Sequence, residues 1–144
     1  MLKTILFPTD FSEISYKALD TFDDLLAGVA EKIVLLHVVD ARSFHILEGF
    51  AYANAKEFEE MTINQANANL EKMAQELRNK ELTVESKVEV GVPVQEILKA
   101  EKGEEISLVV LGSHGKSNVA EMFLGSVAEK VVRKCTKSVL MIKR

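Results

Sequence analysis

The sequence has little of what marks several classes of protein. Its single cysteine, Cys135, allows no disulfide within the chain, which is typical of a reducing cytoplasm. Only two prolines and seven glycines argue against a disordered or fibrous chain. No apolar run approaches the roughly 18 residues of a membrane helix, and the N-terminus lacks the hydrophobic stretch of a signal peptide. We therefore expect a cytoplasmic protein with no membrane partner.

The charged residues argue against a nucleic-acid partner. The chain has 18 Lys or Arg and 22 Asp or Glu, which gives a formal net charge of −4, and no block of basic residues occurs. A protein that binds nucleic acid needs a basic face to displace counterions from the phosphates. The three histidines and Cys135 also lack the spacing of a metal site, and Cys135 is expected to be a structural or surface thiol.

What the sequence does have is a regular alternation of strand and helix patterns. Short apolar runs predict strands at residues 4–7, 32–39, 82–90, 106–111 and 137–143. Between them, apolar residues recur at helical spacing. Two such faces are well defined: Ile14, Ala18, Phe22, Leu25 and Val29 after a capping Ser12, and Phe58, Met61, Ala66, Leu70, Met73 and Leu77 within residues 56–79. Residues 41–55 have no clean period and predict a long loop or a short helix.

This alternation predicts an α/β fold. Strands that alternate with helices form a parallel sheet with right-handed crossovers. We expect one domain over residues 1–144, built on a single doubly wound five-stranded sheet of order 3-2-1-4-5 with helices on both faces. In that order the topology reverses between strands 1 and 4, and ligands bind beyond the carboxyl ends of the strands at such a reversal. The fold thus nominates residues 8–12 and the loop that begins at Gly112.

The loop after the fourth strand has the composition of an anion site. It reads Gly112-Ser113-His114-Gly115-Lys116-Ser117, and Gly125-Ser126 follow beyond it. Glycines let the backbone approach an oxyanion closely, and a helix N-terminus adds unpaired N–H donors. Two common nucleotide motifs are absent: the glycine spacing does not fit a Walker A loop, and the first strand–helix turn has no glycine for a dinucleotide fingerprint.

The spacing Gly112-x2-Gly115-x9-Gly125-Ser126 matches the G-2x-G-9x-G-(S/T) motif of ATP-binding universal stress proteins. The chain resembles that family over nearly its whole length, including the opening residues 5–12, residues 37–40, residues 91–93 and the closing residues 138–143. The resemblance implies ATP as ligand, with any Mg²⁺ carried by the nucleotide. It also implies the contact residues: Pro8, Thr9 and Val38 for the adenine, Asp10 for the ribose, and Gly112, Ser113, His114, Gly115, Lys116, Gly125, Ser126 and Val127 around the phosphates.

Several of these residues have simpler interpretations. Residues 126–129 read as a capping box, which only needs to begin a helix. Asp10 fits a turn or helix cap, Val38 fits a core valine, and His114 fits a solvated loop. His37, within the second strand, is expected to be a packed core histidine.

The last strand predicts a homodimer. In the order 3-2-1-4-5 it lies at the edge of the sheet, where unpaired backbone groups can pair with a second copy. Universal stress proteins commonly dimerise in this way, so the resemblance agrees with this expectation.

Three function classes remain open. The favoured one is an ATP-binding regulatory or stress-response protein in which the nucleotide acts as a switch, with at most slow hydrolysis. The alternatives are a nucleotide-hydrolysing or adenylating enzyme on the same scaffold and a nucleotide-free dimerisation module, against which the complete glycine motif argues.

Overall fold

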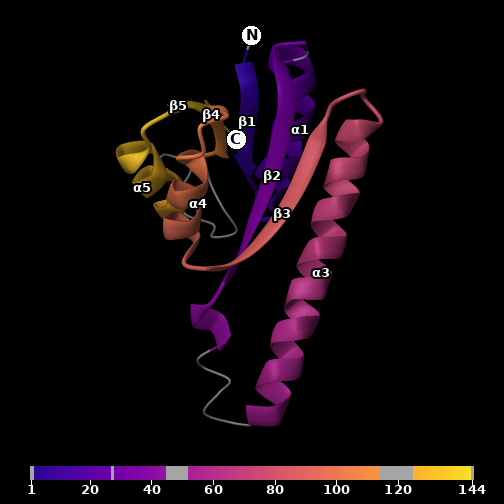
Figure 1. Ribbon diagram of the computed structural model, residues 1–144, viewed down its shortest axis with the longest axis vertical. Helices are drawn as coiled ribbons and strands as arrows, with labels where there is room; N and C mark the ends of the chain where they lie inside the picture. The colour runs from indigo at the N-terminus through magenta and orange to yellow at the C-terminus, as the bar shows by residue number, and fades with distance from the viewer. Residues whose placement is uncertain (1, 27, 45–51, 114–124, 144) are drawn as a thin grey trace.

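The computed structural model describes residues 2–26, 28–44, 52–113 and 125–143. A parallel five-stranded sheet runs through the molecule in the order β3-β2-β1-β4-β5 (Figure 1). Its strands are β1 (Leu2–Pro8), β2 (Ala30–Asp40), β3 (Val84–Gly91), β4 (Ile106–Gly112) and β5 (Ser138–Ile142). The predicted fold class and strand order are confirmed.

Helices lie on both faces of this sheet (Figure 1). They are α1 (Glu13–Leu26), α3 (Tyr52–Arg78), α4 (Pro93–Glu101) and α5 (Ser126–Lys134). Ala18 of α1 and Met73 of α3 pack against Phe7 on one face, while Ile97 of α4 and Val131 of α5 pack with Leu6 on the other. Because Ile5, Leu6 and Phe7 are all buried, β1 is a central strand covered on both sides.

The predicted apolar face of α1 is only partly correct. Ala18 is fully buried, but the Leu25 side chain is 57% exposed and Val29 lies beyond the end of the helix. Leu19, which the expected face did not include, is buried instead. The side chains of Ile14 and Phe22 lie outside what the structure describes.

The predicted apolar face of α3 is correct only in its second half. Ala66, Leu70, Met73 and Leu77 are buried, whereas Phe58 and Met61 are 48% and 63% exposed. Figure 1 shows the reason, because the first turns of α3 extend past the end of the sheet. The helix begins at Tyr52, so the end of the 41–55 segment is helical. Among the helices of the described ranges, none combines the length and hydropathy that crossing a membrane requires.

Candidate functional site

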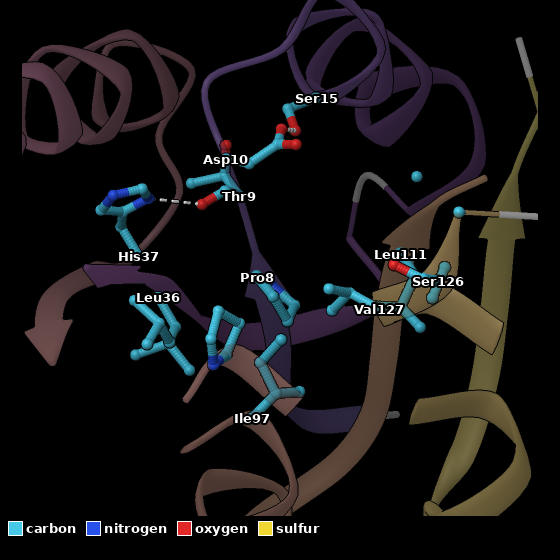
Figure 2. A pocket seen from close by; sticks show the side chains of 15 residues that line it. Pro8, Thr9, Asp10, Ser15, Leu36, His37, Ile97, Leu111, Ser126 and Val127 are labelled. Atoms are coloured by element: carbon cyan, nitrogen blue, oxygen red, sulfur yellow. Dashed lines mark hydrogen bonds between the residues drawn. The ribbon is translucent and has the colours of Figure 1, made fainter. Parts of the chain in front are cut away.

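A cavity of about 240 Å³ lies beyond the carboxyl ends of β1 and β4 and beside residues 36–38 of β2 (Figure 2). These parts of the strands and the first turns of α1, α4 and α5 surround it. Its lining residues are Pro8, Thr9, Asp10, Ser15, Leu36, His37, Val38, Pro93, Ile97, Leu111, Gly112, Gly125, Ser126, Val127 and Ala128. The cavity therefore lies where the order of the strands reverses, at the position the fold nominates for a ligand.

Thr9 is fixed to residues 36 and 37 of the neighbouring strand β2. Its N–H donates to the Leu36 carbonyl at 2.8 Å, and its carbonyl accepts a hydrogen bond from His37 Nδ1 at 2.8 Å. Since a carbonyl only accepts, Nδ1 of His37 carries the proton. The Thr9 hydroxyl also accepts the Phe11 N–H at 3.1 Å. Thr9 thereby holds the chain that leaves β1 in one position.

The backbone of Phe11 has a conformation that non-glycine residues rarely adopt. Its φ is 63°, in the left-handed region. The Phe11 ring lies against the His37 ring, with centroids 4.4 Å apart. This contact and the bond to Thr9 hold a conformation that would otherwise be unfavourable.

The Asp10 carboxylate lines the cavity and also organises the turn. Its Oδ1 accepts the Ser12 N–H at 2.9 Å and the Ser15 hydroxyl at 3.3 Å. The turn interpretation of Asp10 is therefore correct, and it is compatible with a ligand contact because Asp10 is half-buried at the cavity.

One side of the cavity is apolar. The side chains there are those of Pro8, Leu36, Val38, Pro93, Ile97, Leu111 and Val127. Val38 is half-buried and packs with the cluster that contains Ile97, so it contributes both to the core and to the cavity wall. A mostly apolar wall with a few polar groups is the usual composition of a small-molecule site.

The first turn of α5 lines the cavity, and its first backbone N–H groups have no partner within the helix. Helical geometry leaves the amides of Ser126, Val127 and Ala128 without a partner inside the helix. The first intrahelical bond runs from the Glu129 N–H to the Gly125 carbonyl at 2.9 Å, and no side chain in the described part of the protein caps the helix. Such an uncapped helix start attracts an anion.

The predicted capping box at residues 126–129 is wrong. Gly125, not Ser126, is the N-cap residue, and the Glu129 carboxylate pairs with Arg133 at 2.6 Å, one turn farther along the helix. Gly125 has φ −58° and ψ 150°, a conformation open to any residue. Its backbone angles therefore give no reason for glycine here, and close approach of another group would give one.

Ser113 is the one described candidate residue that does not line the cavity. It is buried, its N–H donates to the Ile142 carbonyl at 2.9 Å, and its carbonyl accepts the Gly125 N–H at 2.7 Å. These bonds join Ser113 to Gly125 and to β5. His114, Gly115 and Lys116 lie outside the described residues, so their predicted roles stay predictions.

Sequence reasoning missed some of the lining residues. They are Ser15, Leu36, His37, Pro93, Ile97, Leu111 and Ala128. The expectation for His37 is wrong in part, since the residue is half-buried and lines the cavity. Residues 36–38 lie beside residues 8–10 because Pro8 pairs with Leu36, and this register is visible only in the structure.

The cysteine and the possible metal ligands of the chain were also candidates for a functional role. Cys135, away from the cavity, is half-buried. Burial is the largest cause that raises the pKa of its thiol, the nearby Glu101 carboxylate also raises it, and a backbone hydrogen bond at Lys137 offsets part of the rise. This agrees with a structural thiol. Within the described ranges no group of three His, Cys, Asp or Glu could hold a metal ion. The carboxyl group among the residues that line the cavity is that of Asp10.

A family model, a curated relative and a solved structure agree on what this chain is similar to. A sequence model of the Universal stress protein family matches residues 1–143. Universal stress protein MJ0577 of Methanocaldococcus jannaschii is 38% identical over 156 aligned residues, which cover 100% of this chain and 96% of that protein. A solved structure of MJ0577 has a TM-score of 0.87 at 37% identity and covers 100% of this chain and 97% of that one.

Two further relatives extend this picture. Universal stress protein YxiE of Bacillus subtilis is 32% identical, with 99% of this chain and all of that protein covered. A solved universal stress protein in complex with cAMP is 25% identical and has a TM-score of 0.59, with 99% of this chain and 97% of that one covered.

Proposed function

This chain belongs to the universal stress protein family, and from that membership we propose that it is an ATP-binding regulatory protein. ATP occupies the cavity where β1 and β4 meet, and its presence acts as a ligand-dependent switch in a stress response. A cytoplasmic setting is part of this proposal.

The observation that carries the proposal is the division of the cavity into three kinds of surface. An apolar wall suits a purine base, the Asp10 carboxylate suits ribose hydroxyls, and the uncapped amides of Ser126, Val127 and Ala128 suit phosphate. A nucleotide has three parts of the same chemical kinds. The cAMP complex of a relative supports a nucleotide as the class of ligand.

The residues fall into roles accordingly. We assign the adenine to Pro8, Thr9 and Val38 and the ribose to Asp10. We assign the phosphates to the segment from Gly112 to Val127. This includes His114, Gly115 and Lys116, while Ser113 bonds to Gly125 and to β5. Any Mg²⁺ arrives on the phosphates and is held by them and by water, because the lining residues offer it only the Asp10 carboxylate.

We propose that hydrolysis is at most slow. The titratable side chains that line the cavity are Asp10 and His37. Both contribute to the connection between β1 and α1, on the base and ribose side, and both are hydrogen-bonded within the protein. Turnover should fall below the range of about 1–1,000 per second that is typical of enzymes. A phosphate-release assay on protein free of contaminating ATPase tests this, and a rate inside that range would favour the enzyme alternative.

The proposal also includes a homodimer through β5. Ile142 accepts the Ser113 N–H, so its backbone groups face β4. Because backbone groups alternate along a strand, those of Val139 and Met141 face the open edge. Val139→Pro therefore removes a donor from the open edge and leaves the bonds to β4 in place. Sedimentation should show a wild-type dimer and a monomeric Val139→Pro variant, whereas a wild-type monomer at micromolar concentration would contradict the proposal.

Nucleotide binding is tested first on the purified protein. Extraction should release ATP, and calorimetric titration of the emptied protein should give a saturable ATP isotherm. Gly125→Ala should weaken ATP binding at least about tenfold, since a Cβ would occupy space needed by the phosphates. Gly103→Ala is the matched control, because its new Cβ would come no closer than 3.4 Å to another atom and lies outside the cavity. Equal ATP affinity in both variants would remove Gly125 from the site.

A further inference from the structure

We propose that Ser15 is a positioning residue: it orients the Asp10 carboxylate to accept the ribose hydroxyls of the bound nucleotide and so sets the preference for ribose. This inference rests on the proposed function, because it explains how the same cavity recognises one part of ATP. The sequence motif does not include Ser15, and its role follows from three features of its surroundings.

The first feature is the asymmetric use of the Asp10 carboxylate. Oδ1 accepts both protein donors, the Ser12 N–H at 2.9 Å and the Ser15 hydroxyl at 3.3 Å. Among the described residues, no hydrogen bond to Oδ2 is formed. A carboxylate has room for about four hydrogen bonds. The protein therefore holds one oxygen and leaves acceptor capacity on the other, on a residue that lines the cavity.

The second feature is the burial of Ser15. The residue is only 5% exposed, and it lines the same cavity as Asp10 (Figure 2). It lies in the first turn of α1, where its N–H donates to the Ser12 carbonyl at 3.0 Å. The helix thus fixes the backbone of Ser15, and burial restricts where its hydroxyl can point.

The third feature is the direction of the hydrogen-bond chain. An ionised carboxylate can only accept, so the single hydroxyl proton of Ser15 points to Asp10. The Ser12 hydroxyl, 3.4 Å from that of Ser15, must then be the donor in the contact between the two serines. Two hydroxyls in a row thus direct donors toward Oδ1, and such chains strengthen one another.

These features together point to control of orientation. The bond from Ser15 is longer than the roughly 2.7–2.8 Å of a strong hydroxyl bond, so it adds little binding energy of its own, and we assign it the role of directing the carboxylate. With Ser15 present, Oδ2 stays directed at the ligand and can accept a ribose hydroxyl. Without it, Asp10 is held by the Ser12 N–H alone and can rotate about its last side-chain bond.

The test compares ATP with 2′,3′-dideoxyATP, which lacks both ribose hydroxyls, in calorimetric titrations of the whole protein. A hydrogen bond to a charged group predicts that the wild type binds ATP about 10- to 100-fold more tightly than the dideoxy analogue. Ser15→Ala should reduce this ratio by roughly three- to tenfold, as expected for one oriented hydroxyl. Its affinity for the dideoxy analogue should change less than about twofold, because that ligand has no ribose hydroxyl for Asp10 to accept.

Two further variants complete the experiment. Ser15→Cys keeps the buried space filled with a weaker donor, so it should also lower the ratio and serves if Ser15→Ala fails to fold. Thr21→Val is the matched control: it removes a hydroxyl from the same helix that bonds the Lys17 carbonyl, away from the cavity, and should keep the wild-type ratio.

The outcomes separate the two proposals. A protein that binds neither ligand would contradict the proposed function itself. A wild type that binds both ligands equally well, or Ser15 variants that keep the full ratio, would overturn the role of Ser15 while ATP binding stands. A ratio that falls in the Ser15 variants and persists in Thr21→Val would establish it.

Discussion

Two regions line the cavity: the connection between β1 and α1, and the start of α5. They differ in whether their polar groups have hydrogen-bond partners within the protein. In the first, the backbone of Thr9, the hydroxyl of Ser15 and one oxygen of Asp10 all have partners within the protein. In the second, Gly125 supplies no side chain to cap the amides that follow. One region is closed by internal bonds, and the other is left open.

The difference indicates which part of a ligand each region suits. Internal bonds fix Thr9 and Asp10 before a ligand arrives, so this side can select a rigid base and sugar by shape. The uncapped amides lack hydrogen-bond acceptors, so the α5 side suits a phosphate, whose oxygens accept from several donors. The pre-organised side thus suits the base and sugar, and the side with uncapped amides suits the phosphate.

The largest effect on ATP binding is expected from a side chain that caps the start of α5. Gly125→Asp would place a carboxylate at the N-cap of α5, where it would accept first-turn amides and repel phosphate. Losing two or more charge-assisted bonds predicts at least about a 100-fold loss of ATP affinity, while stability should rise by a few tenths of a kcal/mol. Calorimetric titration and thermal unfolding measure the two effects.

Gly125→Asn is the matched control for charge. Its side chain has nearly the same shape and also caps the helix, but it carries no charge, so it should weaken ATP binding less than Gly125→Asp. If Gly125→Asp bound ATP with wild-type affinity, the start of α5 could not be the phosphate site.

The converse change loosens the closed region. Thr9→Val keeps the shape of the side chain but removes the acceptor of the Phe11 N–H. Thr9 is only 6% exposed, so the loss should lower the free energy of unfolding by about 1–2 kcal/mol, as measured by chemical denaturation. Thr62→Val removes an exposed hydrogen bond from the Thr62 hydroxyl to the Phe58 carbonyl in α3. It should change the free energy of unfolding by less than about 0.5 kcal/mol. Equal losses in both variants would show that Thr9 does not organise the turn.

A smaller effect is expected from salt. Attraction between phosphate and a helix start is screened by ions, whereas apolar and short internal contacts are screened little. ATP affinity should therefore fall by a few-fold between about 50 and 500 mM salt, and adenosine affinity should stay within about twofold. Parallel titrations with both ligands measure this. Equal salt dependence would show that the two regions do not divide base and phosphate.

The sequence predicted the fold well for a physical reason. Buried parallel strands are apolar on both faces, and the runs around Leu6, Leu35 and Val109 are of this kind, so they were recognisable as central strands. The order of the five strands was expected from the doubly wound topology that alternating strands and helices imply. Helix faces were harder, because spacing cannot tell how far the sheet extends beneath a helix. Phe58 and Met61 fit the helical period of α3, yet they are exposed, and the start of α3 extends past the end of the sheet (Figure 1).

Site residues at strand ends or in the glycine motif could be predicted from the sequence. Site residues that helix packing brings to the cavity could not. Asp10 and Gly125 follow from the strand ends and the glycine motif. Pro93 and Ile97 reach the cavity because α4, which begins directly after β3, packs over β2 and β1, and no local sequence pattern reveals this packing. The capping-box prediction failed because the helix begins one residue earlier than the pattern requires, so the serine of the motif is already helical.

The division of the site between its two regions can be measured directly by following backbone amides in nuclear magnetic resonance spectra of ¹⁵N-labelled protein. Adenosine should shift the amides of Thr9, Asp10 and Val38, and ATP should shift these and also those of Ser126, Val127 and Ala128. If ATP left the three α5 amides where adenosine leaves them, the start of α5 would not bind phosphate, and the division of the site into a base side and a phosphate side would be contradicted.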